Sequence, residues 1–105
     1  MIHKEFPWFE SVISVARKMQ ATDIRIMGEN TIFVYSKDGS SRLDTPLFDC
    51  YKSYQDMLRQ FCFYNRIRID NLHPYNSGIY LGCRFTVVLA ALTGGRDEIH
   101  IRREI

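Results

Sequence analysis

Arginine is the residue type whose positions in this sequence are most consistent with binding chemistry. Arg66 and Arg68 stand two residues apart in an alternating run, so on a strand their side chains would share one face. Arg84 opens a second strand-like run, and Arg102 lies in a third. A guanidinium matches phosphate oxygens in bidentate fashion. These arginines are therefore candidates for phosphate contact, and solvated charges that protect a strand edge are the alternative interpretation.

Intramolecular ion pairs are another role open to Arg84 and Arg102. The acidic residues that accompany them in the C-terminal region are Asp97, Glu98 and Glu104. Exposed pairs of this kind contribute only about 0–1 kcal/mol, so they would not explain the choice of arginine. We expect both arginines to belong to a phosphate-facing surface.

The sequence contains no complete motif for catalysis, nucleotide binding or metal binding. Neither G-x-x-x-x-G-K-[ST] nor G-x-G-x-x-G occurs. Gly94-Gly95-Arg96 lies between two alternating runs, which favours a hairpin turn over an anion cradle. His3, His73 and His100 are scattered without a metal-ligand spacing. We therefore expect no catalytic residue, no bound metal, no cofactor and no ATP hydrolysis in this chain alone.

Length and composition are typical of one small globular domain. The chain has 105 residues, of which 46% are hydrophobic, and a formal net charge of +2. This length is enough for one core and too short for two. The charge permits a phosphate-bearing partner without requiring one. Since no signal peptide and no long apolar run is visible, we expect a single cytoplasmic domain over residues 1–105.

The cysteines give no sign of a disulfide framework or a zinc site. Cys50, Cys62 and Cys83 are odd in number, and no pair has C-x-x-C spacing. We interpret all three as small buried hydrophobic residues in a reducing compartment.

Two stretches have the periodicity of amphipathic helices. The first begins near Pro7, which suits a first helical turn, and runs to about Gln20. The second ends near Asn65, and Ser53 with Asp56 three residues later is a variant of the capping box at its start. The residues expected to be buried together, where these helices pack on a sheet, are Phe9, Ile13, Leu58, Phe61 and Val87.

The rest of the chain alternates with the period of strands. Strand-like runs occur at 22–27, 31–35, 41–43, 66–70, 79–81, 84–89 and 99–102. Asp38-Gly39 is a strong turn signal between the second and third runs. We predict an α+β fold in which two helices pack on a mainly antiparallel sheet. The order is helix, three strands, helix and then three or four strands, which is α-β-β-β-α-β-β-β in its shorter form.

Several segments, in this order, resemble the N-terminal domain of CpaF-like ATPases in the type II/type IV secretion (traffic) ATPase superfamily. The resemblance covers roughly residues 20–103 and is carried by Thr22–Asn30, Ile32–Val34, Lys37–Gly39, Arg68–Asp70 with Pro74, Gly82–Phe85, Leu92–Gly95 and Ile99–Arg103. Tyr75–Leu81 and Leu89–Ala91 depart from the family pattern. The Walker motifs of the family's motor domain are absent from the sequence. The chain is therefore expected to be either an excised N-terminal domain or a stand-alone relative.

The resemblance implies a non-catalytic regulatory and assembly domain of a hexameric secretion or conjugation ATPase. In that family the nucleotide lies between the N-terminal and motor domains, and N-terminal arginines can face its phosphates. Arg68, Arg84 and Arg102 match arginines of the family motifs by position. ATP and Mg²⁺ would belong to the implied full-length protein. The implied partners are the motor domain, neighbouring subunits and inner-membrane proteins of the secretion system, at a cytoplasmic location or at the inner face of the membrane.

The alternative is a small stand-alone basic protein, such as an accessory factor of a mobile element that binds nucleic acid. Aromatic residues on predicted strands would then stack on bases. The candidates are Phe33, Tyr35, Tyr80 and Phe85. Burial in the core is the structural interpretation of the same four residues.

Overall fold

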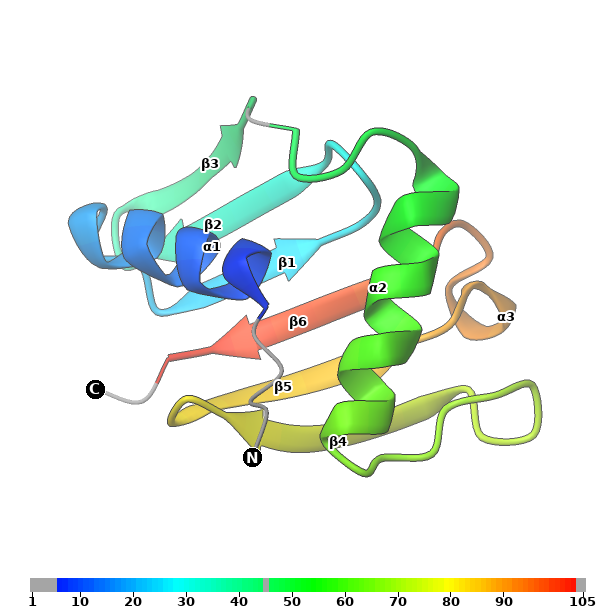
Figure 1. The fold of residues 1–105 in the computed structure, drawn as a ribbon. Coiled ribbons are helices and arrows are strands. Elements are labelled where there is room, and N and C mark those ends of the chain that lie inside the picture. The colour runs from blue at the N-terminus through cyan, green and yellow to red at the C-terminus, as the bar shows by residue number, and fades with distance from the viewer. Residues whose placement is uncertain (1–5, 45, 104–105) are drawn as a thin grey trace.

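The computed structural model describes residues 6–44 and 46–103 of the chain. Three helices and six strands follow one another along these residues (Figure 1). In order they are α1 (Pro7–Lys18), β1 (Asp23–Ile26), β2 (Ile32–Ser36), β3 (Gly39–Leu43), α2 (Tyr51–Tyr64), β4 (Tyr75–Tyr80), β5 (Cys83–Val88), α3 (Ala90–Thr93) and β6 (Glu98–Arg102).

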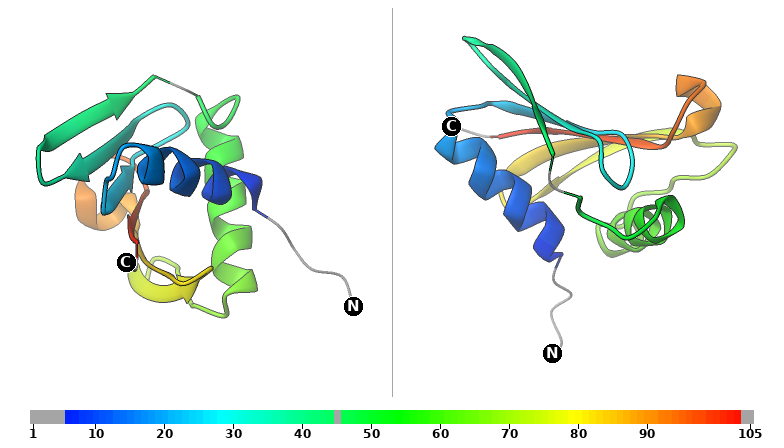
Figure 2. Two further views of the ribbon diagram at one scale, coloured as in Figure 1. Left: turned by 90° about the vertical axis from the view of Figure 1, so that its left-hand side faces the viewer. Right: turned by 90° about the horizontal axis from the view of Figure 1, so that it is seen from above.

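The strands form one sheet in the order β3-β2-β1-β6-β5-β4, and every neighbouring pair is antiparallel. The last strand, β6, lies between β1 and β5 and so joins the N-terminal meander to the β4–β5 hairpin. The two long helices, α1 and α2, lie on the same face of the sheet (Figure 2). The predicted α+β fold is therefore confirmed, with α3 as a short helix that the sequence did not predict.

The core lies between the two long helices and the sheet. All five residues predicted to be buried together are buried and belong to one hydrophobic cluster. On the strands, the side chains that enter this cluster alternate with polar ones, as Ile24 and Ile26 do on β1. The other face of the sheet carries the remaining strand side chains, many of which are polar or charged.

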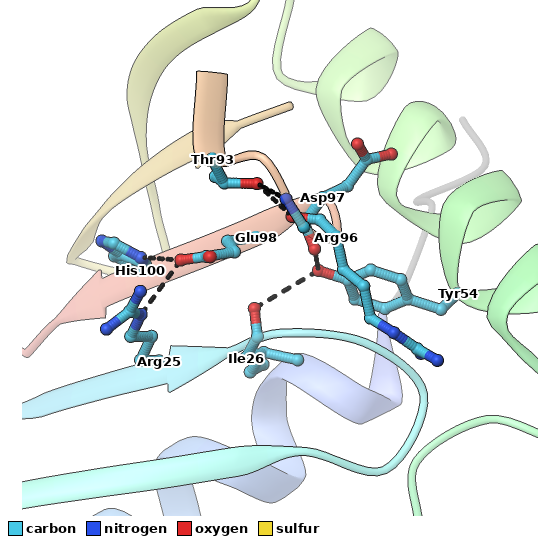
Figure 3. Close-up of polar contacts among 9 residues, drawn as sticks. Arg25, Ile26, Tyr54, Thr93, Arg96, Asp97, Glu98 and His100 are labelled. Atoms are coloured by element: carbon cyan, nitrogen blue, oxygen red, sulfur yellow. Dashed lines mark hydrogen bonds and ion pairs between the residues drawn. The ribbon is translucent and has the colours of Figure 1, made fainter. Parts of the chain in front are cut away.

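The hydroxyl of Tyr54 attaches α2 to the sheet. It donates to the carbonyl oxygens of Asp97, at 2.7 Å, and Ile26, at 3.3 Å, in a buried position (Figure 3). Burial raises the pKa of Tyr54, which keeps the hydroxyl protonated as a donor. The side chain of Asp97 in turn accepts the Ala90 backbone N–H at 2.8 Å, at the start of α3. These bonds fix the backbone at Asp97, directly before β6 begins.

The predicted strand at 66–70 is wrong. Only an isolated bridge between Asp70 and His73 forms there. Arg66 follows α2 in a left-handed conformation, with φ of 58°, which interrupts an extended run. The Asp70 carboxylate accepts the backbone N–H groups of Leu72 and His73. Such local side-chain bonds compete with strand pairing, and they turn the chain toward β4 instead.

Two other local predictions also need correction. The residue before α2 is Cys50, and no side chain caps this helix, so the Ser53–Asp56 capping box does not form. Asp56 pairs with Lys52 instead, at 3.4 Å. The segment between β5 and β6 is not a simple hairpin turn, because α3 forms there and ends at Gly94 in a left-handed conformation with φ of 74°.

The interpretation of the cysteines holds for two of the three. Cys62 and Cys83 are buried, and burial raises the pKa of the Cys62 thiol to about 12. Cys50 is exposed, because it precedes α2 outside the buried stripe of that helix. All three are free thiols.

No helix of the described residues is long and apolar enough to cross a membrane. Within the same residues, no group of three or more histidine, cysteine, aspartate or glutamate side chains is arranged to hold a metal ion.

Candidate anion-facing site

Arg84 and Arg102 lie directly opposite each other on the face of the sheet that the helices leave open. They are register partners on β5 and β6, and Arg102 is also the register partner of Asp23 on β1. Both arginines are exposed. Two guanidinium groups of the same sign are thus held side by side, which is unfavourable without an anion between them or solvent around them.

Neither arginine pairs with Asp97 or Glu98, which the sequence analysis considered as partners. Arg102 Nε lies 3.0 Å from Asp23 Oδ1. The side chain of Arg84 forms no hydrogen bond or ion pair with any residue that the structure describes. Asp97 and Glu98 both contact other groups, and Glu104 lies outside the described residues. Arg84 therefore has its N–H donors available for an external anion.

A second cross-strand row lies beside the first and contains Arg25, His100 and Thr86 on β1, β6 and β5. Glu98 holds the first two of these in place. Its Oε1 lies 3.0 Å from Arg25 Nε and 2.8 Å from His100 Nε2 (Figure 3). Both rows contribute to one shallow depression on the open face, which Tyr35 also lines.

The Glu98 carboxylate, which contacts two residues that line this depression, is itself buried. Glu98 is only 7% exposed. Burial by itself would raise its pKa, but the hydrogen bonds from Arg25 and His100 outweigh burial and lower the pKa below its ordinary value. Glu98 is therefore a positioning residue for Arg25 and His100 on the open face.

Replacing this carboxylate gives a pH-dependent prediction. Because the pKa of Glu98 is lowered in the folded state, its ionised carboxylate stabilises the fold at pH values above the pKa of a glutamate in the unfolded chain, about 4.3. This stabilisation is lost as the pH falls through the lower pKa of the folded state. We expect Glu98→Gln to cost about 1–2 kcal/mol at neutral pH, because a charged acceptor is lost. In urea melts the difference from the wild type should shrink as the pH drops below about 4. A difference that stays constant over this range would contradict the prediction.

Arg68, the third arginine singled out in the sequence, lies elsewhere. It follows α2, and its backbone carbonyl accepts a bond from the side chain of Asn76 on β4. Its Nε lies 2.8 Å from Asp70 Oδ2, and this hydrogen bond lowers the pKa of Asp70 well below its ordinary value. Arg68 lines a different depression from the one that contains Arg84 and Arg102. The structure thus brings two of the three predicted arginines together.

The four strand aromatics divide between the two faces. Tyr80 and Phe85 point into the core, where both contact the ring of Phe61. Phe33 and Tyr35 are half-buried on the open face, as register partners of Arg25 and Asp23. The core interpretation is therefore correct for the first pair only.

The sequence analysis missed Arg25, Glu98 and His100 as members of this site. Arg25 and His100 occupy polar positions between apolar ones in β1 and β6, so their alternation did indicate the open face. Glu98 gave no comparable signal, because a buried acid at the start of a strand is identified only by its partners.

The sequence matches no protein-family model and no curated protein. Among solved structures, the fold is similar to that of the VirB11 ATPase from the Brucella suis type IV secretion system, with a TM-score of 0.75 and 17% sequence identity. The match covers 93% of this chain and 31% of that ATPase chain. This chain therefore spans about a third of the length of the ATPase and has the fold of that part of it.

Proposed function

We propose that this chain acts as the non-catalytic N-terminal regulatory and assembly domain of a hexameric secretion or conjugation ATPase. Its open sheet face would meet the nucleotide that the motor domain binds. Within that face, Arg84 and Arg102 are the residues we propose to face the nucleotide phosphates. Arg68 is the weaker of the three candidates, because its guanidinium is already paired with Asp70.

The observation that carries this proposal is the side-by-side arrangement of Arg84 and Arg102. Strand pairing aims both guanidinium groups from a rigid sheet, and one of them has no acidic partner in the described chain. A polyphosphate presents several anionic oxygens over a short distance, which suits two neighbouring bidentate donors. Arg25 and His100 extend the same basic surface.

The structural neighbour supports the choice of a nucleotide over other anions. It is an ATPase, and it was studied in complex with sulphate, a tetrahedral anion like phosphate. The G-x-x-x-x-G-K-[ST] motif is absent from this sequence, so any hydrolysis would take place in a motor domain that supplies it together with Mg²⁺. We infer a division of labour in which this domain contributes arginines and the motor domain contributes catalysis.

The partners follow from this role as part of the proposal. They are the motor domain, neighbouring copies in a ring and inner-membrane proteins of the secretion system. The domain would then work in the cytoplasm, at the inner face of the membrane.

The test is made in the parent protein, with the motor domain in cis. We expect Arg84→Ala and Arg102→Ala each to lower ATP turnover or nucleotide affinity by about 10- to 100-fold, which corresponds to the loss of charge-assisted hydrogen bonds. The melting temperature should change little, because both side chains are exposed.

Arg17→Ala is the matched control, since Arg17 is exposed on α1, on the other side of the sheet. Wild-type turnover and affinity in both open-face variants would refute the proposed role. Unfolding of either variant would show that the arginine is structural.

Nucleic-acid binding by a stand-alone protein remains the second candidate, and one observation favours it. Phe33 and Tyr35 lie on the open face beside Arg25 and Asp23, so a base could stack there while arginines contact the backbone. Titration with a single-stranded oligonucleotide separates the two functions. Binding that weakens on Phe33→Ala and falls steeply with salt would favour this candidate over the nucleotide.

A further inference from the structure

The C-terminal part of α2 carries an exposed aromatic side chain that the fold does not use. Phe63 is 86% exposed, although the rest of the aromatic residues of this helix contact other rings. The buried stripe of α2 consists of Tyr54, Leu58, Phe61 and Cys62, and Phe63 lies off this stripe. Its exposure therefore follows from its position in the helix.

Two arginines beside Phe63 also lack partners. Arg59 lies four residues earlier on α2, and Arg66 lies just beyond its end. Neither forms an ion pair or hydrogen bond through its side chain within residues 6–44 and 46–103. Together with Phe63, Tyr64 and Ile67 they line a shallow depression. We call this the α2 surface.

The charge of the α2 surface has one sign. Arg68, which also lines the depression, is the only one of its three arginines with a carboxylate partner in the described chain, and that partner is Asp70. The other two, Arg59 and Arg66, line the depression together with the apolar side chains of Phe63 and Ile67. An exposed aromatic residue among arginines is the composition that is enriched at the centres of protein interfaces.

We propose that the α2 surface binds an acidic segment of a partner protein, with an apolar or aromatic side chain of that segment against Phe63 and its carboxylates on Arg59 and Arg66. This goes beyond the proposed nucleotide role and does not depend on it, because α2 and the open face lie on opposite sides of the sheet (Figure 2).

The choice of residues favours a protein over a membrane surface. All the cations of the α2 surface are arginines, whose planar fork matches a carboxylate bidentately. A lipid headgroup layer would be served equally well by lysines, which are point charges. The apolar centre also lies in a depression, which can receive a side chain of a partner.

The experiment selects phage-displayed random peptides on the full chain, with a triple variant as counter-selection. The variant carries Arg59→Gln, Phe63→Ser and Arg66→Asn. Asparagine is chosen because it tolerates the left-handed conformation of Arg66, whose φ is 58°. We expect the selected peptides to combine aspartate or glutamate with an apolar residue. Their affinity should fall at least about tenfold in the triple variant, as for truncated interface centres.

Arg42→Gln is the matched control, since it removes an exposed arginine of β3, outside both proposed sites, and should leave peptide affinity unchanged. Replacing the acidic residues of a selected peptide by their amides should weaken its binding to the wild type. Selected peptides without acidic enrichment, or peptides that bind the triple variant equally well, would overturn the proposal.

Binding to a membrane is tested last, with vesicles of phosphatidylglycerol and phosphatidylcholine. Sedimentation of the wild-type chain with them, lost in the triple variant, would assign the α2 surface to a membrane and overturn the protein partner. ATP turnover and nucleotide affinity of the Arg84 variant are measured in a separate experiment. A failure of the proposed nucleotide role can therefore be distinguished from a failure of peptide binding at the α2 surface.

Discussion

Phe61→Ala is expected to cost about 3–5 kcal/mol of the free energy of unfolding, as the deletion of a fully buried phenylalanine does. Phe61 is 0% exposed and lies at the centre of the aromatic core. Its ring contacts those of Phe6, Trp8, Phe9, Tyr80 and Phe85, at centroid distances between 4.7 and 5.3 Å. The alanine variant loses all these contacts at once and leaves a cavity between α1, α2 and β5.

The same helix provides the control for this measurement. Phe63→Ala removes an identical side chain that is 86% exposed, so its effect should stay within about 0.5 kcal/mol. Urea melts of both variants against the wild type give the comparison. A change below about 1 kcal/mol for Phe61→Ala would mean that the buried face of α2 is wrongly assigned.

Gly78→Ala is expected to destabilise the fold by about 1–3 kcal/mol, through overpacking. Gly78 on β4 is the register partner of Phe85 on β5. A Cβ at position 78 would lie 2.9 Å from Phe85 Cζ and 3.4 Å from Ile67 Cγ2. The buried ring of Phe85 also contacts Phe61, so it has little room to move away.

Ser77→Ala tests whether this effect is specific to the core face. Ser77 precedes Gly78 on the same strand and is exposed, so its replacement should change stability by less than about 0.5 kcal/mol. If lack of space is the cause, Phe85→Leu should partly offset Gly78→Ala in a double-mutant cycle. Additive effects of the two substitutions would contradict this explanation.

Local patterns in the sequence determined most of the elements. The apolar spacing of α1 and α2 predicted both helices and the residues that they bury, because a helix brings every third or fourth side chain to one face. Alternation in β1, β2, β5 and β6 predicted these strands and indicated which of their side chains are polar. Arg84 and Arg102 were accessible to sequence reasoning for this reason, since both are charged residues in alternating runs.

The tertiary structure decided which of these residues meet. Arg84 and Arg102 are neighbours only because β6, the last strand, inserts between β1 and β5, and no local pattern specifies such a pairing. Arg68 alternates with apolar residues just as they do, yet its segment forms no strand, because Asp70 binds the backbone after it. The role of Glu98 is tertiary in part, since its contact with Arg25 depends on the pairing of β1 with β6, whereas His100 lies two residues further along the same strand. Sequence periodicity thus assigns a residue to a face of its own element, whereas long-range strand order decides which charges share a site.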